Sequence, residues 1–227
     1  MIIITGASRG IGDFLFKSFL NDYDEDVKGF YFNSKPSENI EKFTRLNLTN
    51  YEEVERFVNL NIGELKDITL INCAGITYNS YAHKSNQEEW KNVIDTNLIG
   101  TYNIIRALLP IMRSQKYGRI INFSSVVALK PTPGISAYAA SKSALWGLVK
   151  SLAVENAGLN ITVNNINLGY SELGMIEMVP EEYKKAVISQ IPTGILCPPG
   201  DILNTVNFLR NTRYITGASI DLNGGLT

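Results

Sequence analysis

A tyrosine and a lysine four residues apart could form an acid–base pair. Tyr138 and Lys142 lie in a segment of helical period, where positions i and i+4 share one face. A phenol has a pKa of about 10, so it is a poor acid–base group at neutral pH unless a nearby cation such as Lys142 favours its phenolate. Ser125 ends a predicted strand, and its hydroxyl could hold a substrate carbonyl oxygen while Tyr138 protonates that oxygen. Alone, this Tyr–Lys spacing is more often a surface pair, so the interpretation depends on its context.

A glycine-rich segment near the N-terminus could hold a phosphate. Residues 5–12 read TGASRGIG; a strand-like run precedes them and a helical one follows. Glycines permit a tight turn and let a phosphate approach the backbone, while a helix N-terminus supplies N–H donors and partial positive charge. The order of strand, glycine loop and helix therefore predicts a pyrophosphate site. The alternative is a helix entry that holds no ligand.

The composition argues against several other kinds of chemistry. Of the 227 residues 44% are hydrophobic and 19% charged, and 21 Lys and Arg balance 22 Asp and Glu. This balance provides no basic face for nucleic acid and no acidic tail. One histidine, His83, and two distant cysteines, Cys73 and Cys197, cannot build a His-rich or four-cysteine zinc site. We find neither a membrane span nor a signal peptide, so we expect a cytoplasmic protein with reduced thiols and no metal.

Short β-rich runs alternate with longer runs of helical period. The alternation predicts a single α/β domain over residues 1–227, built on a doubly wound parallel sheet of about seven strands with helices on both faces. The expected strands are residues 2–5, 27–32, 43–48, 68–72, 119–123, 161–167 and 218–222, and the expected helices are 11–20, 51–60, 88–114, 137–157, 181–190 and 201–209.

One crossover in this pattern is unusually short. Ten residues, 33–42, separate the second and third predicted strands, which is close to the minimum for a parallel connection. The second helix must therefore be reduced to about a turn or be missing. Ligands of such sheets bind at the carboxyl ends of the strands, so the shortened crossover lies beside the expected nucleotide site.

The combination of these motifs resembles the short-chain dehydrogenase/reductase family over nearly the whole chain. The matching residues are Thr5-Gly6-x-x-x-Gly10-Ile11-Gly12, Asn72-Cys73-Ala74-Gly75, Asn97, Ser125, Tyr138-x-x-x-Lys142 and Asn223-Gly224-Gly225. The resemblance implies a Rossmann-type subunit in which a nicotinamide cofactor exchanges hydride with a carbonyl or alcohol carbon. It also implies a homo-oligomer, a tetramer or a dimer, with no nucleic-acid or membrane partner.

The resemblance assigns roles to individual residues. Tyr138 would be the acid–base residue, and Lys142 would lower its pKa and bind the nicotinamide ribose. Ser125 would orient the carbonyl, and Asn97 would hold a water that continues the proton relay. The implied cofactor contacts are Gly6, Ser8, Arg9, Gly10, Ile11, Gly12, Asn33, Ser34, Lys35, Asn47, Leu48, Asn72, Ala74, Gly75, Tyr138, Lys142 and Gly169.

Two local features favour NADP(H) over NAD(H). Arg9 lies inside the glycine loop, and Asn33-Ser34-Lys35 stands where an NAD enzyme usually places an Asp or Glu for the ribose 2′-hydroxyl. A 2′-phosphate could pair with Arg9, Ser34 and Lys35 because no carboxylate repels it. The alternative is that Lys35 is a solvated loop charge.

Several positions depart from the family pattern. Asn47-Leu48 replaces a usual Asp-Val, although an amide at Asn47 can still accept a hydrogen bond from the adenine amine. Leu173 replaces a Thr that contacts the cofactor in many members, so cofactor affinity is expected to be weaker. We interpret Cys73 as a buried, inert thiol, since no cation is near it in sequence, and His83 as a solvated loop residue.

The substrate is less well defined by the sequence. Residues 191–195 and 214–218 are most similar to bacterial 3-oxoacyl-[acyl-carrier-protein] reductases, and 170–191 matches the family's variable substrate lid. The resemblance thus implies NADPH-dependent reduction of a 3-oxoacyl thioester, as in fatty acid biosynthesis. An acidic carrier protein needs basic residues around the cleft. Two alternatives remain: a reductase of a sugar, polyol or small secondary metabolite, or a non-catalytic NAD(P)-binding regulator. Candidate basic residues for carrier docking are Arg113, Lys116, Arg119 and Lys130.

Overall fold

The β-rich runs of the sequence pair into one parallel sheet. In the computed structural model, which describes residues 1–23, 25–174, 176 and 180–227, the strand order is β3-β2-β1-β4-β5-β6-β7. Each neighbouring pair of strands is parallel, which confirms the expected doubly wound α/β fold. The strands are β1 (Ile2–Thr5), β2 (Val27–Tyr31), β3 (Phe43–Arg45), β4 (Thr69–Asn72), β5 (Gly118–Ser125), β6 (Ile161–Leu168) and β7 (Ser219–Leu222).

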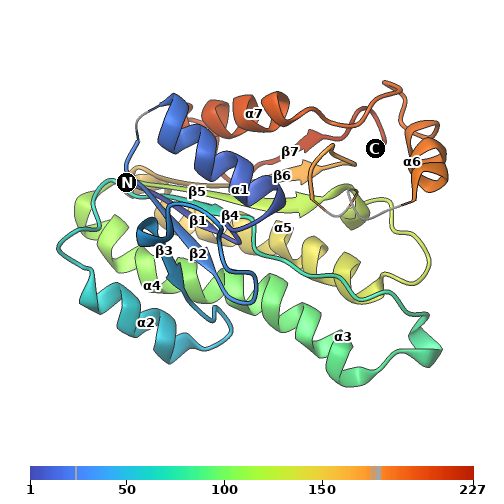
Figure 1. Ribbon diagram of the computed structural model, residues 1–227. Coiled ribbons are helices and arrows are strands. Elements are labelled where there is room, and N and C mark those ends of the chain that lie inside the picture. The colour runs from blue at the N-terminus through green and yellow to red at the C-terminus, as the bar shows by residue number, and fades with distance from the viewer. Residues whose placement is uncertain (24, 175, 177–179) are drawn as a thin grey trace.

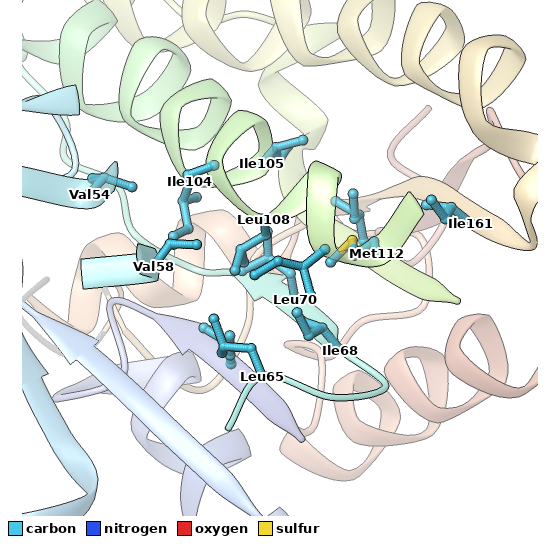
Figure 2. Close-up of a cluster of buried hydrophobic side chains, with 14 of the residues drawn as sticks. Val54, Val58, Leu65, Ile68, Leu70, Ile104, Ile105, Leu108, Met112 and Ile161 are labelled. Carbon is cyan, nitrogen blue, oxygen red and sulfur yellow. The ribbon is translucent and has the colours of Figure 1, made fainter. Parts of the chain in front are cut away.

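Helices cover both faces of the sheet (Figure 1). α1 and α7 pack on one face, and α2, α4 and α5 pack on the other. In Figure 2, Val54 of α2 and Leu108 of α4 lie in the same apolar cluster as Leu70 of β4. No described helix has the length and apolar character needed to cross a membrane. The helices are α1 (Gly10–Lys17), α2 (Tyr51–Leu60), α3 (Gln87–Ile94), α4 (Gly100–Gln115), α5 (Ser136–Asn156), α6 (Glu181–Ile188) and α7 (Pro199–Asn211).

A π-helical turn interrupts the long helix expected over residues 88–114. α3 ends at Ile94, the wider turn spans Asp95–Ile99, and α4 begins at Gly100. Hydrophobic periodicity continues through this region, so the sequence pattern does not reveal the turn. Such wide turns are rare and often occur at functional sites. This one carries Asn97, whose side chain is hydrogen-bonded to a different loop of the molecule.

The short crossover contains no α-helix, as predicted. Between β2 and β3 the described chain has a single 3₁₀ turn, Ile40–Lys42. β3 is shorter than predicted and ends at Arg45, because Asn47 and Thr49 turn the chain toward α2. The carboxyl ends of β2 and β3 are therefore close together, with Arg45 paired in register with Tyr31.

A row of polar side chains, four of them buried and one half-buried, crosses five adjacent strands. Thr5 Oγ1 donates to Asn72 Oδ1 (3.3 Å), and Asn72 Nδ2 donates to Asn122 Oδ1 (2.8 Å). Asn122 Nδ2 donates to Asn165 Oδ1 (3.2 Å), and Asn165 Nδ2 donates to Ser219 Oγ (3.1 Å). We call these five residues the amide ladder. Its members are register partners on β1, β4, β5, β6 and β7, so the bonds join strand to strand from the last residues of β1 and β4, through the middle of β5 and β6, to the first residue of β7.

The ladder stabilises the sheet only as long as it is complete. Its three asparagines are between 0% and 3% exposed, so a broken bond would leave a buried amide without a partner. All the bonds run in the same direction, which lets each polarise the next. The sequence pattern does not predict the ladder, since it depends on the register of strands far apart in the chain.

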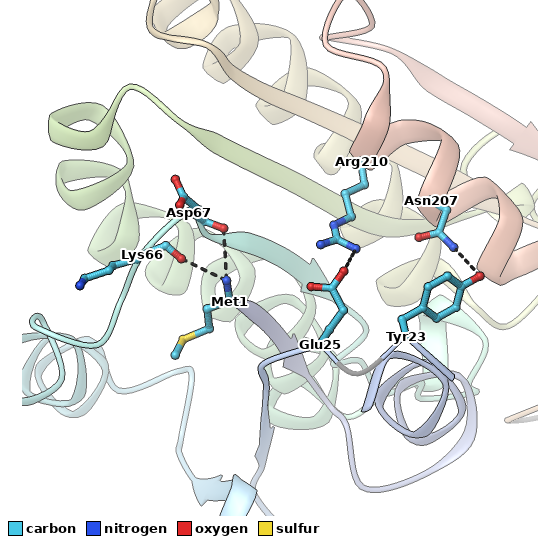
Figure 3. A network of polar contacts seen from close by, with 7 residues as sticks. All are labelled: Met1, Tyr23, Glu25, Lys66, Asp67, Asn207 and Arg210. Carbon is cyan, nitrogen blue, oxygen red and sulfur yellow. Dashed lines mark hydrogen bonds and ion pairs between the residues drawn. The ribbon is translucent and has the colours of Figure 1, made fainter. Parts of the chain in front are cut away.

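A second polar network lies at the opposite edge of the sheet (Figure 3). The N-terminal ammonium of Met1 donates to the Lys66 and Asp67 carbonyls, at 3.1 and 3.4 Å. Arg210 of α7 pairs with Glu25 at 2.7 Å, and this hydrogen bond lowers the pKa of the Glu25 carboxyl. These contacts attach the amino ends of β1 and β2 to neighbouring segments, away from the edge where ligands of such sheets bind.

We predict that Asn122→Ala lowers the free energy of unfolding by about 2–5 kcal/mol, because it leaves Asn72 Nδ2 and Asn165 Oδ1 buried without partners. Urea denaturation measures the change. Asn59→Ala, an exposed position on α2, is the matched control and is expected to have little effect. Equal effects of the two substitutions would show that the ladder does not stabilise the sheet.

Candidate active site

The glycine loop is held against the end of β4 by close backbone contact. Gly6 has a φ of +63°, and a Cβ on it would lie 2.7 Å from the Ala74 Cα. A Cβ on Gly12 would lie 2.2 Å from the Gly6 carbonyl oxygen, so no side chain fits there. The Thr5 hydroxyl accepts a hydrogen bond from the Ala74 N–H at 3.2 Å. The loop, Ala74 and the amide ladder therefore form one rigid unit.

The N-terminus of α1 offers donors for an anion. Asn50 and Asn86 cap α2 and α3 with their side chains, whereas Arg9, at the N-cap of α1, makes no such bond. The first N–H groups of a helix need partners from outside the helix. The expected contacts Gly10, Ile11 and Gly12 form this first turn. The residues present therefore fit the pyrophosphate of a dinucleotide.

Ser125 and Tyr138 meet at the carboxyl end of β5. Ser125 is the last residue of this strand, and Tyr138 lies in the first turn of α5. Burial raises the pKa of the Tyr138 phenol to about 12, although a hydrogen bond with the Ser125 hydroxyl acts in the opposite direction. Tyr138 is therefore a neutral hydrogen-bond donor at physiological pH.

Lys142 is buried beside this pair, with 5% of its surface exposed. Its Nζ donates to the Phe123 carbonyl oxygen at 2.6 Å and lies 5.6 Å from the centre of the Tyr138 ring. Burial lowers the pKa of Lys142 to about 8. The ammonium contacts this carbonyl rather than the phenol oxygen, and the lowering of the Tyr138 pKa by Lys142 stays a prediction.

Asn97 connects three elements of the site. Its Oδ1 accepts from the Ile76 N–H at 2.8 Å, and its Nδ2 donates to the Ile76 carbonyl at 2.9 Å and to Ser141 Oγ at 3.0 Å. The Ser141 hydroxyl in turn donates to the Tyr138 carbonyl at 2.8 Å. The sequence pattern does not single out Ser141, because a serine within a helical segment is common and gives no functional signal of its own.

Gly75 lies between Asn97 and Lys142. A Cβ on Gly75 would lie 3.4 Å from Asn97 Oδ1 and 3.6 Å from Lys142 Nζ. The structure thus brings together Asn97, Ser125, Tyr138 and Lys142, the four residues that sequence analysis assigned to the chemistry. They lie at the carboxyl ends of the neighbouring strands β4 and β5, where Asn72 ends β4 and Ala74 follows it two residues later.

The adenosine end agrees less well with the expectations. Asn33, Ser34 and Lys35 follow β2 and are exposed, as is Arg9. Asn47 Oδ1 accepts from both the N–H and the hydroxyl of Thr49, at 3.1 and 2.8 Å. Both of its lone pairs are used, so the expected acceptance from an adenine amine requires this turn to open.

Leu48 and Gly169 take part in backbone packing. Leu48 contacts α4, since a Cβ on Gly100 would lie 3.1 Å from the Leu48 Cβ. The Gly169 N–H donates to the Leu222 carbonyl at 2.9 Å, and a Cβ on Gly169 would lie 2.8 Å from the Asn223 Cα. Gly169 therefore packs closely against the closing Asn-Gly-Gly motif.

The start of the expected lid lies against the glycine loop. A Cβ on Gly10 would lie 3.0 Å from the Gly174 Cα. The Leu173 N–H and carbonyl both hydrogen-bond to the Ser171 hydroxyl, at 3.3 and 2.8 Å. Residues 175 and 177–179 of the expected lid lie outside the described residues.

Cys73 and His83 are placed much as expected. Burial raises the pKa of the Cys73 thiol to about 12, which keeps it protonated and unreactive. Lys142 is far from Cys73 in sequence but acts on its thiol in the fold, so a cation does lie near Cys73 and favours its thiolate, an effect smaller than that of burial. His83 is exposed in a 3₁₀ turn, beside the Tyr81 ring.

Three of the four basic residues considered for carrier docking lie away from the cleft of their own subunit. Arg113 and Lys116 end α4 and precede β5, and Arg119 is the second residue of that strand. Ser125 is at the opposite end of β5. Arg119 is also buried, and its guanidinium donates to backbone carbonyls, including that of Arg210 at 3.0 Å. Of the four, only Lys130 follows the carboxyl end of the strand.

The family model, the relatives and the solved structure that match this chain all point to one family. A family model described as short chain dehydrogenase matches residues 1–184. The chain is 35% identical over 234 residues to the 3-oxoacyl-[acyl-carrier-protein] reductase FabG of Haemophilus influenzae, covering 99% of this chain and 96% of that protein. It is 32% identical over 240 residues to the FabG of Thermotoga maritima, with the same coverages. The crystal structure of the Brucella melitensis 3-oxoacyl-[acyl-carrier protein] reductase matches with a TM-score of 0.90 and 29% identity, covering 99% of this chain and 90% of that one.

The fold and the comparisons lead to the same conclusion. The family model covers most of the chain, the relatives match nearly all of it, and the fold matches that of a solved reductase over 99% of this chain. The chain belongs to the short-chain dehydrogenase/reductase family, whose members are NAD(P)-dependent oxidoreductases acting on CH–OH and C=O groups.

Proposed function

We propose that the protein is an NADPH-dependent carbonyl reductase that transfers hydride to the ketone of a 3-oxoacyl thioester. The observation that carries this proposal is the pairing of Ser125, the last residue of β5, with the buried phenol of Tyr138 in the first turn of α5, whose pKa the Ser125 hydroxyl lowers. This pair lies on the same edge of the sheet as the uncapped N-terminus of α1. The relatives named 3-oxoacyl-[acyl-carrier-protein] reductase support the choice of substrate.

In this proposal two hydroxyls act on the carbonyl oxygen. The nicotinamide, when bound, supplies the hydride. Ser125 donates a hydrogen bond that orients and polarises the carbonyl, and Tyr138 gives its proton to the oxygen as negative charge develops there. The raised pKa of about 12 favours this direction, because it keeps the phenol protonated until the oxygen becomes strongly basic.

Lys142 and Asn97 support the proton donor. Lys142 would bind the nicotinamide ribose and place its charge near Tyr138 when the phenolate forms, which stabilises that anion. Asn97 would hold the water through which the proton of Tyr138 is replaced. Its Nδ2 protons are both used by Ile76 and Ser141, so a water would be held by an acceptor: the second lone pair of Oδ1 or the main-chain carbonyl, which also accepts from Thr101 Oγ1 at 2.8 Å.

We further propose NADPH over NADH, with Arg9, Ser34 and Lys35 around the 2′-phosphate. All three are exposed, and the glycine loop that carries Arg9 lies beside the end of β2. In the adjoining crossover the charge of the Glu38 carboxylate contributes to the raised pKa of Lys17 on α1.

The proposal also includes the organisation of the chain. Residues 1–227 would form one domain, residues 170–191 would close over the substrate, and the chain would act as a homo-oligomer.

We predict that the wild-type protein oxidises NADPH in the presence of an acetoacetyl thioester and that Tyr138→Phe abolishes turnover. Removing the hydroxyl removes the proton donor but keeps the ring, so NADPH affinity should be nearly unchanged. Absorbance at the NADPH band measures turnover, and protein fluorescence measures binding. Tyr81→Phe, at an exposed tyrosine, is the control. Wild-type turnover in Tyr138→Phe would refute the mechanism, while NADPH binding without turnover on any carbonyl would favour the regulator.

We predict that kcat/KM for carbonyl reduction is level at neutral pH and falls as the pH rises above about 8. Burial lowers the Lys142 pKa to about 8, so its charge is complete below that pH and is lost above it. Tyr138, with a pKa of about 12, keeps its proton throughout this range. With NADPH saturating, kcat/KM for the carbonyl reports the groups of the cofactor-bound enzyme before the carbonyl binds. A profile that stays level up to pH 10 would contradict the assignment.

A further inference from the structure

Arg45, which sequence analysis did not consider, is fixed at the end of β3. It is the last residue of that strand, and its Nε donates to the Phe32 carbonyl oxygen at 3.1 Å. Its guanidinium lies 4.9 Å from the centre of the Phe32 ring. An exposed arginine is usually mobile, but here one hydrogen bond and one ring contact hold the plane of the group.

The two terminal nitrogens of the Arg45 guanidinium are available to a ligand. Within the described part of the chain, neither terminal nitrogen of Arg45 forms a hydrogen bond or an ion pair. Both Arg45 and Phe32 are exposed. The two terminal nitrogens form a planar fork that matches two oxygens of a phosphate.

The position of Arg45 connects it with the adenosine end of the cofactor site. Phe32, its partner, directly follows β2 and directly precedes Asn33-Ser34-Lys35. The Ala7 N–H of the glycine loop donates to the Phe30 carbonyl at 3.0 Å, so the loop carrying Arg9 lies beside the same strand end. The absence of a helix in the described crossover leaves β3 directly beside this strand end.

We propose that Arg45 binds the 2′-phosphate of the cofactor's adenosine and, with Arg9 and Lys35, determines the choice of NADPH. This inference rests on the proposed NADPH preference and adds a residue and a geometry to it. Arg9 and Lys35 supply charge from exposed positions, whereas Arg45 supplies a fork whose orientation is set before binding. Pre-organisation reduces the entropy lost on binding.

The test is calorimetric binding of 2′,5′-ADP and 5′-AMP to the full chain, because these two probes differ only in the 2′-phosphate. Arg45→Gln should weaken 2′,5′-ADP binding by about tenfold, as expected for a charge-assisted phosphate contact, and leave 5′-AMP binding unchanged. Arg45→Lys keeps the charge but loses the fork, and should give an intermediate loss. Arg56→Gln, at an exposed arginine on α2, is the matched control and should change neither affinity.

Three results would overturn the inference. One is wild-type affinity of Arg45→Gln for 2′,5′-ADP, and another is an equal loss for both probes, which would mean a role outside the 2′-phosphate. The third is a wild-type protein that binds 2′,5′-ADP no more tightly than 5′-AMP. Failure of the proposed reductase activity would give a different result. The protein would then still prefer 2′,5′-ADP in an Arg45-dependent way, but it would reduce no carbonyl with either cofactor.

Discussion

The buried amide ladder connects the chemistry of this protein to its sheet. Five hydrogen-bonding side chains, Thr5, Asn72, Asn122, Asn165 and Ser219, occupy register positions that would otherwise be apolar. The ladder begins at the Thr5 hydroxyl, which also holds the Ala74 N–H and thereby fixes the glycine loop against β4. The groups proposed to bind cofactor thus depend on bonds that reach the edge strand β7.

Burial determines the acid–base character of the site more than the proximity of opposite charges does. The phenol of Tyr138 and the ammonium of Lys142 both lose water, so the pKa of the first rises and that of the second falls, and both groups move toward their neutral forms. A neutral phenol that is hydrogen-bonded to Ser125 suits the donation of a proton to a carbonyl. It suits the reverse reaction less well, because removing a proton from an alcohol requires the phenolate.

Local sequence predicted the parts of the site that depend on local rules. The glycine loop, the i, i+4 pair of Tyr138 and Lys142 and the short crossover each follow from spacing along a single segment. The ladder, the π-helical turn at Asn97 and the Ser141 link depend on contacts between distant strands and helices, which no single segment encodes. The same reason explains two corrections: Asn47 Oδ1 is used by Thr49, and Arg119 lies buried at the far end of β5.

The proposed reaction is hydride transfer to a ketone, with the proton supplied by the protein. The most direct measurement is a reaction with NADPH deuterated at C4 and an acetoacetyl thioester, followed by mass spectrometry of the product. We predict one deuterium on the carbinol carbon of the 3-hydroxyacyl thioester and none on its hydroxyl in ordinary water. A protein that binds NADPH but forms no labelled product from this or any other ketone would contradict the account.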